Sequence, residues 1–85
     1  MIVGKGLPTY NRTMTKEEIQ KLIQAGMPDA KVVVRGDDGQ HFEAEVTSAS
    51  FAGKNPVQQH RMVYATLGDK MGREIHALKL TTRAS

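Results

Sequence analysis

Three histidines are the residues of this chain best suited to chemistry, because an imidazole can bind a metal, carry a proton or form hydrogen bonds. His41 follows an expected turn, His60 falls inside an expected helix, and His76 stands at the start of an apolar stretch. The chain has no cysteine, so it offers no thiolate as a metal ligand or nucleophile. Any metal must therefore be held by histidine or carboxylate groups, or share its ligands with a partner.

The other polar residues form no recognisable catalytic arrangement. Ser48 and Ser50 lack a surrounding Gly-x-Ser-x-Gly turn, and no ladder of calcium ligands follows Asp37 and Asp38. A chain of 85 residues is one small domain, with little room for a secluded pocket beside its core. We expect a binding protein without catalytic residues, not an enzyme.

Charge and hydropathy indicate whether this chain is suited to bind nucleic acids or membranes. The formal net charge of +3 comes from twelve basic and nine acidic residues. This balance favours polyanions weakly, but it is short of the basic density of a dedicated nucleic-acid-binding domain. The apolar runs are too short for a membrane span or a secretory signal. We therefore expect a cytoplasmic protein that does not bind membranes.

The first half of the chain predicts a leader, a helix and a hairpin. Residues 1–13 show no apolar periodicity and are expected to be a flexible leader to a domain spanning 14–85. Thr15 and Glu18 have the spacing of a capping box, and the helix that they begin is expected to stop at Gly26.

Two strands should follow that helix. Residues 31–35 hold three consecutive valines between charges, and 36–39 read Gly-Asp-Asp-Gly, a strong turn signal. After the turn, apolar and polar residues alternate from Phe42 to Thr47, which predicts a strand with one buried face. The two strands should form an antiparallel hairpin.

The second half predicts helical segments and a last strand. Residues 48–54 form a connection with one helical turn around Ala49 and Phe51. Asn55 and Pro56 then begin a helix that is expected to run to about Lys70. Its apolar face is predicted from the spacing of Val57, His60, Val63, Tyr64 and Leu67.

Residues 75–81 are expected to form the last strand, with His76 on the same face as Leu78 and Leu80. The order α-β-β-α-α-β predicts a two-layer α+β sandwich, with a three-stranded mixed sheet covered by helices on one face.

Three spaced motifs point to a known family. Phe51-Ala52-Gly53, then His60-Arg61-Met62-Val63-Tyr64, then Ile75-His76-Ala77-Leu78 resemble the F-x-G, H-R-x-V-Y and I-H-A-L signature of the BolA family. The resemblance covers the chain from about Met14 onward and implies an arrangement like the type II KH fold. The compact hairpin is more similar to the BolA-like subgroup than to BolA itself.

The resemblance also implies a metal role. In BolA-like proteins the histidine of I-H-A-L, here His76, is proposed as a ligand to a 2Fe-2S cluster shared with a monothiol glutaredoxin, which supplies its cysteine and a glutathione thiolate. A second ligand often lies in the hairpin loop. Here Asp38 occupies roughly the place where some relatives carry cysteine. His41 is the only imidazole nearby and is the expected second ligand. Without its partner, the chain is expected to be a monomer or a weak homodimer.

Other interpretations remain open. His60 and Tyr64 are expected to be structural, with His60 hydrogen-bonded locally. The family is also described as stress-responsive, DNA-binding transcription regulators, and phosphate contacts would then fall to basic residues of the helical layer and its flank: Lys54, Arg61, Lys70 and Arg73. The Gly-Asp-Asp-Gly turn matches the G-x-x-G string of KH domains only formally, because its aspartates would repel phosphate. A scaffold without metal is a third alternative.

Overall fold

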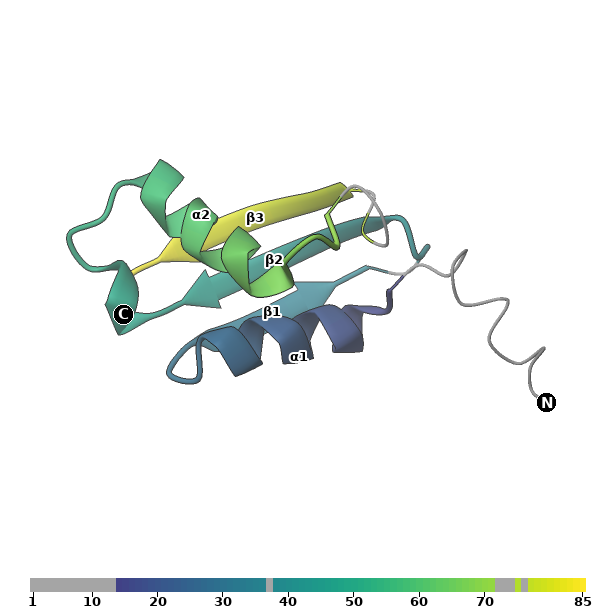
Figure 1. Ribbon diagram of the computed structural model, residues 1–85, viewed down its shortest axis with the longest axis horizontal. Coiled ribbons are helices and arrows are strands. Elements are labelled where there is room, and N and C mark those ends of the chain that lie inside the picture. The colour runs from purple at the N-terminus through teal and green to yellow at the C-terminus, as the bar shows by residue number, and fades with distance from the viewer. Residues whose placement is uncertain (1–13, 37, 72–74, 76) are drawn as a thin grey trace.

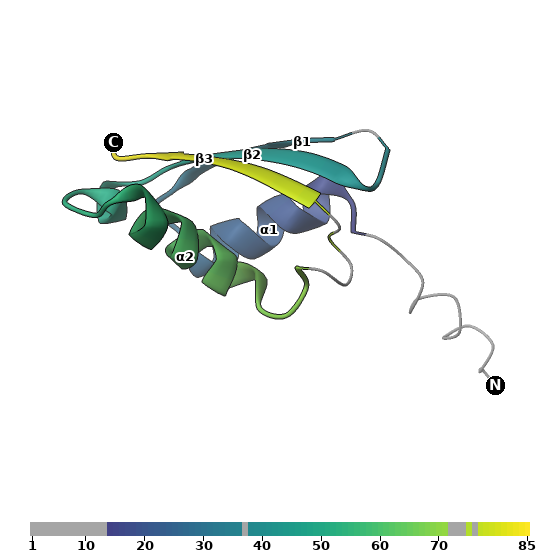
Figure 2. The same ribbon diagram turned by 90° about the horizontal axis from the view of Figure 1, so that it is seen from above.

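Two helices and a three-stranded sheet form two layers (Figures 1 and 2). The computed structural model describes residues 14–36, 38–71, 75 and 77–85; the expected leader, 1–13, lies outside them. The elements in chain order are α1 (Lys16–Gly26), β1 (Lys31–Arg35), β2 (His41–Thr47), the 3-10 turn η2 (Ala49–Phe51), α2 (Pro56–Leu67) and β3 (Ala77–Arg83). Both helices lie on one face of the sheet and leave the other face open (Figure 2). The predicted α+β sandwich is confirmed.

The sheet is mixed, with β2 in the centre and the strand order β1-β2-β3. β1 and β2 form the expected antiparallel hairpin, in which Val33 is opposite Glu45. β3 runs parallel to β2, with His41 opposite Ala77. Parallel pairing needs a long crossover, and the segment that contains α2 provides it.

The start of α1 is capped as its sequence predicts. The hydroxyl of Thr15 accepts from the amide of Glu18 at 3.2 Å, and the carboxylate of Glu18 accepts from the amide of Thr15 at 2.9 Å. At the other end, Gly26 is the last helical residue. A Cβ atom there would lie 2.6 Å from Thr66 Cγ2, so this glycine allows α1 to approach α2 closely.

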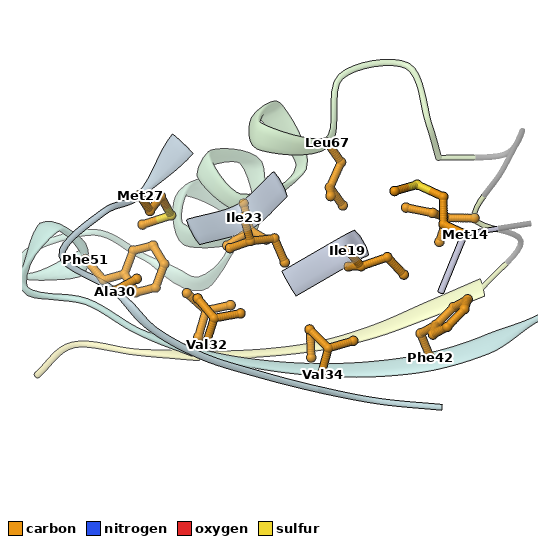
Figure 3. Packing of buried hydrophobic residues seen from close by; sticks show 14 residues of the cluster. Met14, Ile19, Ile23, Met27, Ala30, Val32, Val34, Phe42, Phe51 and Leu67 are labelled. Atoms are coloured by element: carbon orange, nitrogen blue, oxygen red, sulfur yellow. The ribbon is translucent and has the colours of Figure 1, made fainter. Parts of the chain in front are cut away.

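The core lies between the helices and the sheet (Figure 3). Phe51 of η2 is fully buried at one end, and Phe42 closes the core from β2. The buried set is completed by aliphatic residues from every layer: Met14, Ile19, Ile23, Met27, Ala30, Val32, Val34, Ala44, Val46, Val63, Leu67 and Ile75. The alternation predicted for the strand from Phe42 to Thr47 is thus confirmed in β2.

The helix α2 begins as predicted but ends earlier, and its first turn does not reach the core. Asn55 and Gln58 form a capping box. The helix stops at Leu67 instead of Lys70, because Gly68 adopts a φ of 60°, outside the right-handed helical region. The expected apolar face was partly wrong: Val57 is 59% exposed. It lies in the first turn, and the core is reached further along by Val63 and Leu67.

The last strand lies further along the chain than predicted. It spans Ala77–Arg83 instead of residues 75–81. Ile75 belongs to the connection, where its side chain is fully buried and its amide donates to the carbonyl of Lys70 at 3.0 Å. Leu78 and Leu80 are half-buried against the core, as expected. No helix in the described part of the chain is both long and apolar enough to cross a membrane.

Candidate metal and partner site

Two of the predicted functional residues, His76 and Arg73, lie outside the residues that the structure describes. His41 and the strand that begins after His76 are the described parts of the expected metal site. His41 is the first residue of β2 and is paired with Ala77, the first residue of β3. The amide of Ala77 donates to the carbonyl of Gln40 at 3.1 Å. The chain directly after His76 is thus hydrogen-bonded beside His41.

Asp38 holds the start of β2 in place. Its Oδ1 accepts from the amides of Gln40 and His41, each at 2.9 Å, while its Oδ2 lies 2.9 Å from His41 Nδ1. The side-chain hydrogen bond with His41, followed by these backbone bonds, lowers the pKa of Asp38 far below its ordinary range. Asp38 is therefore ionised at neutral pH.

This ionisation determines which ring nitrogen of His41 carries the hydrogen. An ionised carboxylate can only accept hydrogen bonds, so Nδ1 must be the donor to Asp38. In the neutral ring, Nε2 then holds the free lone pair. The side chain of His41 is 75% exposed, and a metal-binding histidine usually donates the N–H of its other ring nitrogen to a carboxylate, a backbone carbonyl or a water. His41 thus fits the role of a metal ligand offered to a partner.

The side chain of His41 lines a hollow at the end of the sheet. This hollow has a volume of about 520 Å³, and its lining includes His41, Arg35, Glu43, Ala77 and Lys79. Arg35 is engaged on the same face with Glu45 and, at 3.8 Å, with Glu43. Among the described residues, no group of three or more His, Cys, Asp or Glu side chains could hold a metal ion. A metal at His41 would need ligands from elsewhere.

His60 lies within α2 and contacts an aromatic neighbour on the same helix. Its ring is half-buried and meets Tyr64 edge-on, with ring centroids 6.4 Å apart and planes at 88°. No hydrogen bond joins the His60 ring to another described residue. The edge-to-face contact supports the structural role expected for His60 and Tyr64, which stays a prediction.

The basic residues of the helical layer differ in exposure. Lys54, two residues before α2, and Arg61, within it, are exposed, whereas Lys70 is half-buried after the helix. Sequence reasoning missed the role of Asp38, which it treated only as a replacement for cysteine. The signal was the Asp-x-x-His spacing across a glycine turn, since a turn aspartate commonly bonds the backbone two residues on.

The elements form a small α+β domain with an exposed imidazole at one end of its sheet. A family model described as BolA-like protein matches residues 13–85, and the chain belongs to this BolA family. The DNA-binding transcriptional regulator BolA of Vibrio cholerae is 44% identical over 54 residues, which cover 64% of this chain and 50% of that protein.

Solved structures agree with this assignment. A BolA protein homologue from Coxiella burnetii matches with a TM-score of 0.75 and 38% identity, covering 85% of this chain and 92% of that one. The BolA domain of SufE1 from Arabidopsis thaliana matches with a TM-score of 0.69 and 25% identity, covering 81% and 90%. The resemblance found from the three sequence motifs is thus confirmed.

Proposed function

We propose that this chain is a cytoplasmic BolA-like binding module that shares a 2Fe-2S cluster with a monothiol glutaredoxin, for iron-sulfur assembly, trafficking or iron sensing. The observation that carries the proposal is the oriented and exposed ring of His41 beside the strand that follows His76. His41 and His76 would be this chain's ligands, and the partner would supply its cysteine and the thiolate of glutathione.

The residues of this chain have distinct tasks in that role. Asp38 keeps the hydrogen of His41 on Nδ1, so that Nε2 keeps its lone pair for a metal without a change of tautomer. A bound cluster would supply electron storage, and imidazole ligands in place of thiolates raise its reduction potential. The pairing of His41 with Ala77 fixes the backbone of the residue that follows His76 beside His41.

The test is anaerobic co-purification with a monothiol glutaredoxin and glutathione, followed by visible absorption and circular dichroism. We expect His76→Ala and His41→Ala to alter the spectrum of the mixed complex while the free variants stay folded. His60→Phe is the matched control, because it removes a histidine but keeps the aromatic contact with Tyr64. An unchanged spectrum for folded His76→Ala would rule out its ligand role.

A DNA-binding regulator is the second candidate, favoured by the name of the Vibrio cholerae relative. Its phosphate contacts would come from Lys54, Arg61, Lys70 and Arg73. Phosphate contacts weaken steeply as salt rises, whereas metal ligation does not. A duplex-DNA titration at several salt concentrations therefore separates the two functions, and loss of binding in Lys54→Glu with Arg61→Glu would support this one.

A further inference from the structure

The outer edge of β3 is open to pairing. β3 is an outer strand of the sheet, and within the described part of the chain no strand pairs with its far side. The amide of Ala77 donates to Gln40, and the carbonyl of Arg83 accepts from Ser48, each at 3.1 Å. In a parallel ladder, alternate residues bond to the same neighbour. The backbone groups of the even-numbered residues, 78, 80 and 82, are therefore directed away from β2.

Charges alternate across the exposed face of the sheet. Arg35 of β1 is opposite Glu43 of β2, and Glu43 is opposite Lys79 of β3. This row therefore reads positive, negative, positive, and it ends at the outer strand. A second cation, Arg83, lies four residues along β3 on the same face, and both Lys79 and Arg83 are exposed. A further strand would extend the alternation if it carried acidic residues opposite these two cations, because opposite charges on paired strands stabilise a sheet.

The helix-facing side of β3 has a different character. Leu78 and Leu80 are half-buried and pack against the core. Side chains of an added strand would alternate between the two faces. Along the stretch from Lys79 to Arg83, those on the open face would lie beside the two cations, and those on the other face beside Leu80 and Thr82, both half-buried. β-branched residues suit such half-buried positions, so the best complement is acidic, β-branched, neutral, β-branched, acidic.

We propose that the outer edge of β3 binds an extended acidic segment of a partner protein as a fourth strand, with carboxylates paired to Lys79 and Arg83. This mode of recognition takes affinity from backbone hydrogen bonds and specificity from alternate side chains. It goes beyond cluster sharing and requires no metal. Because β3 begins opposite His41, a partner bound along it also reaches the candidate metal site.

Other occupants fit this edge less well. Two copies of the chain paired through β3 would place Lys79 and Arg83 of both copies on one strand pair, where like charges repel. Nucleic acid would meet Glu43 and Glu45 in the centre of the open face. Apart from His41, the described residues of that face supply no ring on which a base could stack: Lys31, Val33, Arg35, Glu43, Glu45, Thr47, Ala77, Lys79, Thr81 and Arg83.

The proposal is tested by an NMR titration of the ¹⁵N-labelled full chain with the capped peptide Thr-Glu-Val-Thr-Val-Glu-Thr. This peptide reads the same in both directions, so it serves a parallel or an antiparallel strand. We expect the largest amide shifts at Leu78, Leu80 and Thr82. The control peptide, with lysine in place of both glutamates, should bind at least about tenfold more weakly.

Charge-reversed proteins complete the test. The double variant Lys79→Glu, Arg83→Glu should bind the acidic peptide about tenfold more weakly, or weaker still, and should prefer the lysine peptide. Lys16→Glu with Lys21→Glu makes the same change of charge on α1 and should leave the affinity unchanged. Folding of both variants is checked by amide dispersion.

Three results would overturn the proposal. The first is equal binding of both peptides, and the second is binding of neither, which would leave the cations only the role of protecting an edge strand from self-association. The third is a set of shifts confined to β1 or α2. Duplex DNA that shifts these β3 amides when the acidic peptide does not would assign the edge to phosphate instead.

Discussion

Ser48 donates its buried hydroxyl to Asp29 Oδ2 at a distance of 2.6 Å. The same serine accepts at Oγ from the amide of Ser50 at 3.0 Å, and its own amide donates to the carbonyl of Arg83 at 3.1 Å. Ser48 is the only buried polar residue in the described part of the chain, with 1% of its surface exposed. It joins the end of β2 to the loop before β1 and to the end of β3.

Ser48→Ala should lower the free energy of unfolding by about 1–3 kcal/mol, because it leaves the carboxylate of Asp29 and the amide of Ser50 without their partner. Equilibrium urea denaturation measures the change. Ser50→Ala is the control, since Ser50 is exposed and contributes its backbone amide to this network. Equal losses in both variants would show that the Ser48 hydroxyl has no special role.

Gly26→Ala should destabilise the protein, although the same change usually favours a helix by about 1 kcal/mol. The added Cβ would lie 2.6 Å from Cγ2 and 2.9 Å from Cβ of Thr66, which forces α1 and α2 apart at a cost of about 1–3 kcal/mol. Thermal unfolding measures the effect. Adding Thr66→Ser removes the closer atom and should restore part of the loss. A stabilised Gly26→Ala protein would show that the helices are not in close contact there.

Asp38→Asn tests the tautomer of His41. An asparagine side chain can turn either its carbonyl or its amide toward Nδ1, so it no longer requires Nδ1 to be the donor. We expect the ¹⁵N chemical shifts of the His41 ring to show one neutral tautomer in the wild type and a mixture in the variant. His60, which has no carboxylate on its ring in the described structure, serves as the internal reference. An unchanged His41 spectrum would show that Asp38 does not select the tautomer.

Arg35 and Glu45 should make stability depend on pH in acid. The hydrogen bond from Arg35, and then its charge, lowers the pKa of Glu45. A lowered folded-state pKa stabilises the folded state above the ordinary glutamate pKa, and the gain is lost as pH falls through the lowered value. Wild type should therefore exceed Glu45→Gln in stability at neutral pH but not at strongly acidic pH.

Urea denaturation at several pH values, in low and high salt, checks this expectation. The difference should be small, because both side chains are about half exposed and surface ion pairs are screened. A difference in stability between wild type and Glu45→Gln that increases in acid would contradict the lowered pKa of Glu45.

Much of the fold could be predicted because local signals agree with the tertiary structure. The capping residues Thr15 and Asn55 mark true helix starts, and the valines of 31–35 form a true strand. Where elements end is harder to predict. Leu67 ends α2 because of the conformation of Gly68, a local choice of one glycine, whereas Ile75 lies in the core instead of the sheet, which depends on tertiary packing.

The site could be predicted only in part. Periodicity placed Val57 on the apolar face of α2, but it cannot tell which turns of a helix lie over the sheet. The sequence also could not show that Asp38 bonds to His41, since this depends on turn geometry, or that Ala77 lies opposite His41, since this depends on parallel pairing. The roles of His76 and Arg73, and the likeness to the type II KH fold, stay predictions.

The parallel pairing of β2 with β3 also has a kinetic consequence. The β1-β2 hairpin joins residues close in sequence, whereas the pairing of His41 with Ala77 joins residues far apart in sequence. The entropic cost of closing a loop rises with its length. Long-range pairing of this kind slows folding. We therefore expect β3 to dock late, so that a nascent or partly folded chain would lack both the candidate ligand site and the edge proposed for the partner. Binding at this end of the sheet would then report that folding is complete.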